Sequence, residues 1–388
     1  MSVSDSQIYE FPSEENAAKS LYVHVPFCFH RCGYCDFTLV SGRDDLIPEY
    51  LEALRNELAT LTQKGRLDTV FIGGGTPTHL NPDQLADLLQ LIHQHFDLSP
   101  DVEFTVEANP EGLLAEQMAV LAAHGVNRLS LGVQSFDDTI LSTLERQHRS
   151  DQAAAVIQQA ERFFSSVSLD LIFGVPGQTE ELWQQTLTTA LSLPVNHLST
   201  YGLTFEKGTS FFQRRATGTL NPLSDEVERR MYAHAIDRSG AAGFEHYEIS
   251  SFARPGHRCR HNINYWNSSG YFAFGPGAAR YINGIRSTNA RSVTRWVKSW
   301  LKGQPALQDV EKLSADAKIR EAIFLALRQI DGISIADFDR RWDIDLLRDF
   351  APAIDDNIAK GLLTVSDGRV QLTSEGIFFA DNVSADFL

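Results

Sequence analysis

The feature that most constrains the fold of this chain is a repeated alternation of short apolar, strand-like runs with stretches of helical apolar spacing. The stretch 81–96 is typical of the helical half, with Asn81 suited to the N-cap and Pro82 to the first helical position. Six strand-plus-helix units in succession predict a mainly parallel sheet covered by helices. The expected strands are residues 21–25, 68–72, 102–110, 127–136, 167–176 and 197–205, with further helices over 48–63 and 113–124.

Polar residues fall at or just past the C-terminal ends of these expected strands. They are His24, the run 73–76, Glu107, Gln134 and Asp170. Barrels build their active sites at that face, and open α/β sheets bind ligands at the same strand ends. The pattern predicts a ligand site there and favours a complete or partial barrel, while a doubly wound open sheet stays an alternative.

The character of the chain changes after about residue 250. The stretch 258–284 is rich in aromatic residues, Gly and Asn, and we expect it to be irregular. Helices are expected again from about residue 292, followed by a hairpin over 361–373 that turns at Asp367-Gly368. This order predicts a small winged-helix-like C-terminal domain. The expected division is an N-terminal tail (1–20), a barrel (21–250), a connecting segment (251–295) and the C-terminal domain (296–388).

Charge and leader-type patterns exclude several classes of protein. A net charge of −16 argues against general nucleic-acid binding, which needs a surface rich in Lys and Arg. The sequence has no run of about eighteen apolar residues, so we expect no membrane span. The first twenty residues are polar and acidic and lack the features of a secretory leader, so we expect a cytoplasmic protein.

Three of the four cysteines form a C-x3-C-x2-C cluster, Cys28, Cys32 and Cys35, while Cys259 lies far away in the sequence. Thiolates are soft ligands that suit zinc or iron–sulfur clusters. A structural zinc site needs four ligands, so His24 or His30 would have to complete it. A [4Fe–4S] cluster on three cysteines would leave one iron open to a small molecule. The spacing leaves both kinds of metal site open.

The motif set as a whole is similar to one protein family. The segments YVHVPFC…CGYCDF, GGGTPT, VEANP, LGVQSF, RQH, DLIFGVPGQT and HNINYW occur in order over roughly residues 20–388. They resemble the radical S-adenosylmethionine (SAM) superfamily, in particular the HemN-like anaerobic coproporphyrinogen III oxidase family with its HemW haem-chaperone branch. This resemblance implies a partial (β/α)6 barrel with a small C-terminal α+β domain. It also implies a [4Fe–4S] cluster on the three clustered cysteines, with SAM on the open iron.

Positions that match the family's motifs are expected to bind SAM. Glycines after a strand let backbone groups approach a zwitterionic ligand closely. A carboxylate at a strand end, as at Glu107, suits a hydroxyl or an ammonium group. Asp170 stands in an apolar run, where an unpaired carboxylate would be costly, so it is a site residue or a paired core charge. The expected SAM-binding residues are Tyr22, Tyr34, Gly74, Gly75, Thr76, Glu107, Gln134, Arg146 and Asp170.

Two branches of the family remain to be distinguished. The dehydrogenase branch carries a further cysteine two positions after the third ligand, but Phe37 stands there in this sequence. That branch also has a longer segment before the motif, whereas only 21 residues precede Tyr22 here. The H-N-x-x-Y-W pattern of the HemW branch is present, with His261, Tyr265 and Trp266 as haem candidates and His257 or Cys259 as substitutes for the ligand. The resemblance therefore favours binding and delivery of haem over oxidative decarboxylation of coproporphyrinogen III, which stays the alternative.

The favoured branch also implies partners. The resemblance implies respiratory or membrane-associated haem proteins as acceptors, and an electron donor such as flavodoxin or ferredoxin. It is compatible with a monomer or a haem-dependent dimer. A third class, a structural protein stapled by zinc, would contain one zinc ion and no iron.

Overall fold

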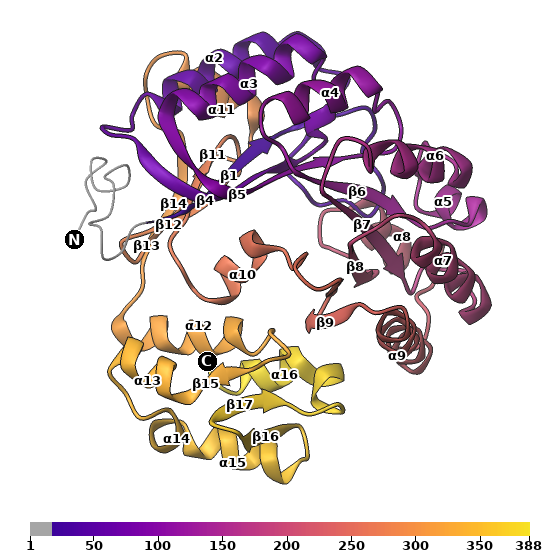
Figure 1. The fold of residues 1–388 in the computed structure, drawn as a ribbon, viewed down its shortest axis with the longest axis vertical. Coiled ribbons are helices and arrows are strands. Elements are labelled where there is room, and N and C mark those ends of the chain that lie inside the picture. Colours follow the sequence, from indigo (N-terminus) through magenta and orange to yellow (C-terminus); the bar gives the residue numbers. More distant parts are fainter. Residues whose placement is uncertain (1–17) are drawn as a thin grey trace.

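The computed structural model describes residues 18–388, and its largest element is a curved nine-stranded sheet (Figure 1). The strand order is β11-β1-β4-β5-β6-β7-β8-β10-β9. Neighbours from β11 to β8 are parallel, and β10 and β9 complete one edge in antiparallel pairs. The strands are β1 (Ser20–Val25), β4 (Gly65–Gly74), β5 (Phe96–Ala108), β6 (Arg128–Gln134), β7 (Ser166–Phe173), β8 (His197–Gly202), β9 (Glu245–Glu248), β10 (Ser251–Ala253) and β11 (Phe272–Phe274).

The order of the strands decides between the two arrangements that the sequence leaves open. From β1 to β8 the strands lie side by side in the order in which they follow along the chain, without the reversal that a doubly wound sheet requires. The edge strands β11 and β9 do not pair with each other in the part of the chain that the structure describes. The predicted partial barrel is therefore confirmed, and the open doubly wound alternative is wrong.

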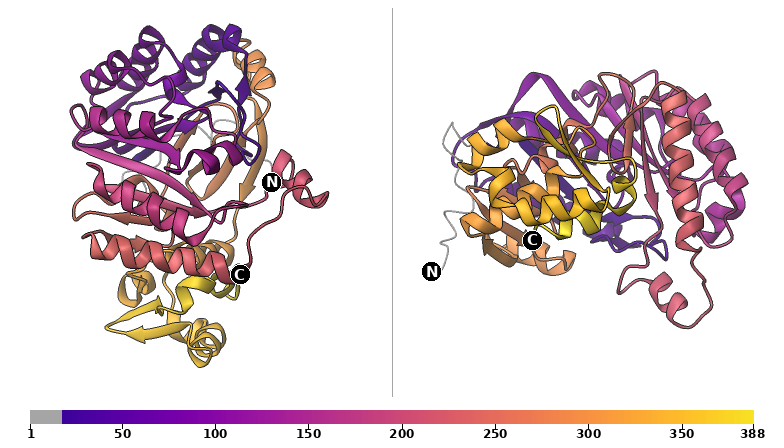
Figure 2. Two further views of the ribbon diagram at one scale, coloured as in Figure 1. Left: turned by 90° about the vertical axis from the view of Figure 1, so that its right-hand side faces the viewer. Right: turned by 90° about the horizontal axis from the view of Figure 1, so that it is seen from below.

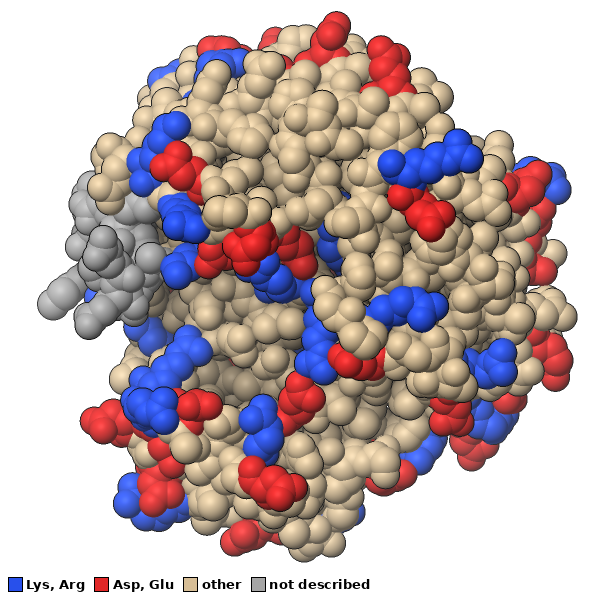
Figure 3. Space-filling model, in the orientation of Figure 1, with Lys and Arg blue, Asp and Glu red and all other residues tan. Residues whose placement is uncertain are grey.

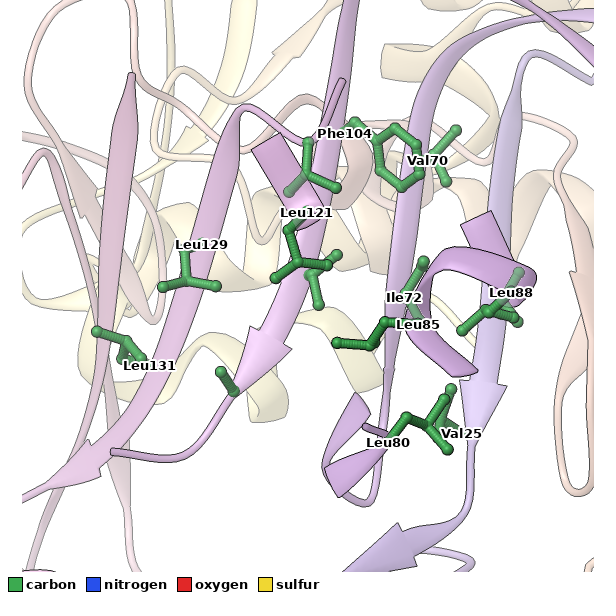
Figure 4. Packing of buried hydrophobic residues seen from close by; sticks show 14 of the residues in the cluster. Val25, Val70, Ile72, Leu80, Leu85, Leu88, Phe104, Leu121, Leu129 and Leu131 are labelled. Atoms are coloured by element: carbon green, nitrogen blue, oxygen red, sulfur yellow. The ribbon is translucent and has the colours of Figure 1, made fainter. Parts of the chain in front are cut away.

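Helices cover the convex face of the sheet (Figure 1). The core lies between the two layers, where Leu85 and Leu88 of α3 and Leu121 of α4 approach the side chains of β4, β5 and β6 (Figure 4). In β5 and β6 apolar and polar residues alternate, so that Phe104, Val106, Leu129 and Leu131 form the face that belongs to this core. The helices are α2 (Ile47–Leu58), α3 (Pro82–His95), α4 (Ala115–Ala123), α5 (Asp138–Thr143), α6 (Ser150–Ala160), α7 (Glu180–Ser192), α8 (Ser210–Ala216), α9 (Asp225–Ala241) and α11 (Val293–Trp300).

The predicted start of α3 is confirmed in detail. The Asn81 side chain accepts a hydrogen bond from Gln84 N at 2.9 Å, and Gln84 Oε1 accepts from Asn81 N at 3.0 Å. Pro82 occupies the first helical position. This reciprocal arrangement satisfies two of the backbone donors that a helix leaves free at its N-terminus.

The expectation that 258–284 is irregular is wrong in part. The segment contains the helix α10 (Arg260–Trp266) and strand β11, which pairs with β1 in parallel at the edge of the barrel. The chain then forms a separate antiparallel sheet with the order β12-β13-β14. β11 is only three residues long, so its pattern in the sequence is too short to be recognised. The strands of the small sheet are β12 (Ala279–Ile282), β13 (Ile285–Asn289) and β14 (Leu307–Lys312).

The C-terminal residues form a unit with its own apolar core (Figures 1 and 2). It contains α12 (Ala315–Ala326), β15 (Ile333–Ser334), α13 (Ile335–Trp342), α14 (Leu346–Asp349), α15 (Ala351–Ala359), β16 (Leu363–Ser366), β17 (Arg369–Leu372) and α16 (Ala380–Ala385). The predicted hairpin is confirmed as β16 and β17, with both Asp367 and Gly368 at positive φ, as a type I′ turn requires. This is the small α+β domain that the sequence predicts.

The boundaries of the domains stay predictions. The expected start of the C-terminal domain at residue 296 falls within α11, whose Trp296 and Trp300 belong to the core of the barrel. The fully buried members of the second core begin only at Ala322. This packing favours a later boundary. The expected tail, residues 1–20, lies almost wholly outside the described residues.

The described surface and helices bear on two further expectations. Within residues 18–388, no helix is both long and apolar enough to span a bilayer. Acidic and basic side chains are intermixed on the face shown in Figure 3, without an extended patch of one sign. That face therefore lacks the continuous basic footprint of a nucleic-acid-binding surface.

Candidate functional site

The three clustered cysteines lie in the loop that follows β1, where β2 (Phe27–Cys28) pairs with β3 (Val40–Ser41). Cys28, Cys32 and Cys35 are half-buried free thiols that line one end of a cavity of about 1020 Å³. Among residues 18–388, no three His, Cys, Asp or Glu side chains already converge as a metal site does. Burial raises the pKa of the Cys35 thiol to about 11, so it is a neutral thiol at pH 7 until a bound cation favours the thiolate.

The two histidines that could complete a zinc site differ in their availability. His24 donates from Nε2 to Thr38 O at 2.6 Å and accepts from the Tyr22 hydroxyl at Nδ1 at 2.9 Å. Burial lowers its pKa to about 4, so the ring is neutral and neither nitrogen is left for a metal. The expectation that His24 could ligate zinc is wrong in this conformation. His30 is half-exposed beside the cavity, 3.9 Å from the Glu145 carboxylate.

The glycine run at the end of β4 packs directly against the cysteine loop. Gly74 has a φ of +114°, and a Cβ there would lie 2.5 Å from the His24 ring. A Cβ on Gly75 would lie 2.6 Å from Phe27 O. Both glycines line the cavity. They are therefore needed for the close approach of the loop as well as for any backbone contact to a ligand.

Two carboxylates line the cavity, Glu107 near the end of β5 and Asp170 within β7. Burial and the nearby Asp170 raise the pKa of Glu107 to about 7, although Glu107 accepts a hydrogen bond from Gly74 N at 3.0 Å. Burial raises the pKa of Asp170 to about 6, against hydrogen bonds from Ser199 and Ser130. Carboxylates with such shifts in a cavity are suited to bind a cationic or hydroxyl-bearing ligand.

Gln134 and Arg146 also reach the cavity. Gln134 ends β6 after an irregularity in the ladder and has a φ of +67°, which is rare for a residue with a side chain. The Arg146 side chain is only 6% exposed. Its guanidinium donates to Asn109 Oδ1 at 2.6 Å and to Gly132 O at 2.8 Å.

The remaining expected SAM-binding residues divide into two groups. Tyr34 lines the cavity and packs edge-on against Phe211 of α8, which projects from the barrel beside the cysteine loop (Figure 2). Tyr22 and Thr76 do not line it. The Tyr22 ring stacks on Phe71, and the Thr76 hydroxyl lies 3.0 Å from Cys28 Sγ. Seven of the nine expected residues thus meet at one cavity, and their role in binding SAM stays a prediction.

The first haem candidate, His261, lies on α10 and is buried inside the barrel. Thr69 Oγ1 donates to Ser20, so it accepts from His261 Nδ1–H at 2.8 Å. Burial lowers the pKa of His261 to about 3, and the neutral ring accepts from the Tyr265 hydroxyl at Nε2 at 2.7 Å. Both ring nitrogens are therefore occupied. Coordination of haem iron by His261 stays a prediction that requires the Tyr265 hydroxyl to leave and the ring to become accessible.

The other haem candidates also lie in this region. The Trp266 ring lies under the Arg328 guanidinium at 4.7 Å, and Arg328 lines the cavity. Cys259, a possible substitute ligand, is fully buried with its Sγ 3.7 Å from Glu103 Oε1, as expected for an ordinary buried thiol. His257, the other substitute, is half-buried and does not line the cavity.

The cavity has an outer part that sequence reasoning missed. It extends from the cysteines past the end of β8 to the segment before α16, and its walls there include Tyr201, Tyr232, Phe378 and Phe379. Tyr201 and Phe379 are large and exposed. Because these residues come from three separate parts of the chain, no local pattern could reveal them. Asn109 was also missed, although it stands in the VEANP motif two positions after Glu107.

Comparisons with known proteins agree with this geometry. The Radical SAM superfamily profile matches residues 22–190, and the HemN C-terminal domain profile matches residues 313–379. The chain is 38% identical to "Heme chaperone HemW" of Bacillus subtilis, over 95% of this chain and 99% of that protein. It is 37% identical to the protein of the same name in Mycobacterium tuberculosis strain H37Rv, over 94% and 93%.

One mammalian relative and one solved structure extend these matches. The mouse protein "Radical S-adenosyl methionine domain-containing protein 1, mitochondrial" is 33% identical over 96% of this chain and 88% of its own length. The structure of coproporphyrinogen III oxidase (HemN) from Escherichia coli superposes with a TM-score of 0.83 at 24% identity, over 95% of this chain and 89% of that chain. At that identity the structural match supports the fold alone.

Proposed function

The chain belongs to the radical SAM superfamily and, within its HemN-like members, to the group that carries the name haem chaperone HemW, and on that premise we propose that it binds haem and delivers it to acceptor haem proteins. The observation that carries this proposal is one cavity with two chemically different ends. Its inner end has three thiols and two carboxylates, and its outer end has exposed aromatic rings. Its volume of about 1020 Å³ lies at the upper end of the roughly 300–1,000 Å³ typical of ligand pockets.

The inner end suits an iron–sulfur cluster and SAM. Cys28, Cys32 and Cys35 supply three soft donors, which leaves one iron for the methionyl end of SAM. Gly74 and Gly75 offer backbone groups, while Glu107 and Asp170 offer carboxylates to the cationic and hydroxyl groups of that ligand. When bound, the cluster supplies one-electron reduction, and the residues around it bind and orient the ligands.

The outer end suits a flat, largely apolar macrocycle. Phe378 and Phe379 come from the C-terminal domain, and Tyr201 and Tyr232 come from the barrel, so the pocket has walls from both units. Aromatic rings bury large areas and favour stacking on other conjugated systems. The Trp266 of the H-N-x-x-Y-W motif contacts Arg328 on the wall of this region, which connects the motif to the proposed haem site.

The first experiment separates haem delivery from the alternative, oxidative decarboxylation of coproporphyrinogen III. Anaerobically reconstituted protein with measured cluster absorbance is incubated with SAM, a reductant and coproporphyrinogen III, and products are separated by chromatography. We expect no decarboxylated product, because Phe37 stands on the cavity wall at the position where the dehydrogenase branch has a further cysteine. Turnover would contradict the chaperone proposal. A colourless protein with one zinc and no iron would contradict both the chaperone proposal and the dehydrogenase alternative.

A second experiment tests haem binding and transfer directly. Haem is titrated into wild type, Phe379→Ala, His261→Ala and Tyr265→Phe, and the loaded proteins are mixed with an apo-haem protein while the absorbance of the acceptor is followed. We expect Phe379→Ala to weaken haem binding about tenfold or more, which corresponds to the loss of about 1.4 kcal/mol of ring contact. Tyr265→Phe frees Nε2 of His261, so tighter binding in that variant would assign His261 as ligand. Absence of haem binding by wild type would contradict the proposal.

A further inference from the structure

Two of the three cysteines are joined by a path of hydrogen-bonded side chains, whose central residue, Asn109, has no role assigned above. The Thr76 hydroxyl lies 3.0 Å from Cys28 Sγ, and Arg146 Nη1 lies 3.9 Å from Cys32 Sγ. Asn109 lies between these two partners. Its Nδ2 donates to Thr76 Oγ1 at 2.8 Å, and its Oδ1 accepts from Arg146 Nη2 at 2.6 Å. The path from one sulfur to the other is therefore continuous.

The direction of each hydrogen bond along this path follows from chemistry. A guanidinium has donors only, so the Asn109 oxygen must face Arg146 and its NH2 group must face Thr76. Thr76 Oγ1 thus accepts from Asn109, and its own proton is free to be donated. A cysteine that holds iron is a thiolate, which can only accept. The Thr76 proton then points to Cys28, and the Arg146 guanidinium donates both to Cys32 and, through Asn109, toward Cys28.

The surroundings hold Arg146 in place independently of Asn109. The guanidinium also donates to Gly132 O at 2.8 Å and lies 3.4 Å from Glu111 Oε1. Glu111 in turn lies 2.8 Å from His148 Nδ1, and the other nitrogen of that ring bonds to Val133 O at 3.1 Å. A change at Asn109 is therefore expected to leave the Arg146 side chain in position.

We propose that Asn109 is a positioning residue that links Cys28 to Cys32 by hydrogen bonds and so sets the reduction potential of the cluster that these cysteines hold. The inference rests on the proposed cluster, and it assigns Thr76 and Arg146 to the sulfurs, whereas the sequence led us to expect them on SAM. Hydrogen bonds to cluster sulfurs withdraw electron density and favour the reduced, more negative state. A donor chain that begins at a cation reinforces each bond along it.

The test measures the midpoint potential of the reconstituted cluster by a redox titration followed by electron paramagnetic resonance, with iron counted in each sample. Thr76→Val and Asn109→Leu should each take up iron and shift the potential to a lower value. Asn109→Leu should cause no further shift in the Thr76→Val background, because both changes interrupt the same path to Cys28. Thr76→Ser keeps the hydroxyl and should retain the potential of wild type.

Thr78→Val is the matched control, two positions from Thr76. Thr78 accepts a hydrogen bond from Gln117 through its backbone carbonyl, which the substitution retains. The midpoint potential of the cluster in Thr78→Val should therefore equal that of wild type. Fully loaded Asn109→Leu with the potential of wild type would overturn the inference, as would shifts that add in the double variant. Loss of iron in Asn109→Leu but not in Thr76→Val would overturn it too, because it would assign Asn109 to assembly of the cluster.

Two further outcomes keep this inference distinct from other assignments. If Thr76 acts on SAM, Thr76→Val will weaken SAM binding at an unchanged potential, which contradicts the inference. If wild type itself takes up no iron, the proposed cluster is contradicted. That result would overturn the proposed function, on which this inference rests.

Discussion

At the scale of single residues, the four cysteines have different surroundings. The three loop thiols face the cavity, whereas Cys259 is enclosed beside Glu103. We expect Cys28→Ala, Cys32→Ala and Cys35→Ala each to abolish the cluster absorbance of the reconstituted protein. Cys259→Ala should retain it together with the iron content. Loss of the cluster in Cys259→Ala alone would contradict this assignment of ligands.

Glu107 should make the stability of the cluster-free protein depend on pH. Its pKa in the folded protein rises from 4.5 to about 7, chiefly through burial. Between those values the unfolded chain loses the proton while the folded protein keeps it, so folding loses about 3 kcal/mol as pH rises from 4.5 to 7. Glu107→Gln should remove this loss. The free energy of unfolding in urea, measured at pH 5 and pH 8 for wild type and Glu107→Gln, checks this prediction. The same pH dependence in both proteins would contradict it.

Sequence motifs identified part of this site, whereas the remaining contacts depend on the tertiary structure. The cysteines could be found by their C-x3-C-x2-C spacing, and the glycine run and Glu107 because they stand at strand ends, which a parallel sheet brings to one edge. Asp170 could be found because it interrupts an apolar run, although it lies within β7 rather than at its end. The hydrogen bonds of His261 could not be found, since they depend on how α10 is seated inside the barrel. A sequence pattern identifies residue types but not which lone pairs are already in use.

At the scale of elements, one buried ion pair and its hydrogen bonds fix strand β12 and the segment before it to helix α2. Glu57 of α2 accepts hydrogen bonds from Gly275 N at 2.8 Å and Asn289 Nδ2 at 2.7 Å, and lies 3.2 Å from the Arg280 guanidinium. The same segment packs on the cysteine loop, because a Cβ on Gly277 would lie 2.5 Å from Thr38 Oγ1. The pair therefore helps to hold the loop that carries the proposed cluster ligands.

Arg280→Met should destabilise the protein by about 3–5 kcal/mol, because it leaves the Glu57 carboxylate buried without its cation. The double variant Glu57→Leu/Arg280→Met should recover most of that loss. Arg55→Met on the same helix is the control, since its pair with Asp87 is exposed and should contribute about 1 kcal/mol at most. Chemical denaturation measures all three, and a tolerated Arg280→Met would show that the pair is not needed.

Most elements could be predicted because each has a clear period. Expected strands at 68–72 and 102–110 correspond to β4 and β5, although both real strands begin several residues earlier. Tertiary pairing extends these strands beyond the run of apolar residues, through Gly65 and Phe96. The edge strand β11 was missed, since three apolar residues carry no period of their own.

At the scale of the whole molecule, the cavity depends on contact between the barrel and the C-terminal domain. Arg229 of α9 forms a two-pronged ion pair with Glu375 at 2.9 and 2.6 Å and lies 4.2 Å above the Phe378 ring. Ile249 N also donates to Arg328 O at 3.0 Å, and Ile330 N donates to Tyr247 O at 3.1 Å. The wall of the proposed haem site is thus formed only when the two units are in contact.

Arg229→Ala should change the free energy of unfolding by about 1 kcal/mol or less, because the ion pair is exposed. Hydrogen exchange of residues 375–382 should nevertheless increase, and haem binding should weaken. Arg230→Ala is the matched control, since the neighbouring arginine pairs with Glu180 within the barrel. Equal exchange in the two variants would contradict a role for Arg229 in holding the domain.

The backbone of Gln134 has a consequence for engineering. A residue with a side chain at a φ of +67° costs of order 1 kcal/mol or more, whereas glycine adopts that conformation freely. Gln134→Gly should therefore relieve strain at the end of β6 while it removes an amide from the cavity wall. A directed-evolution screen that rewards heat resistance alone would accept that exchange, so a screen for sturdier variants of this protein must also select for ligand binding.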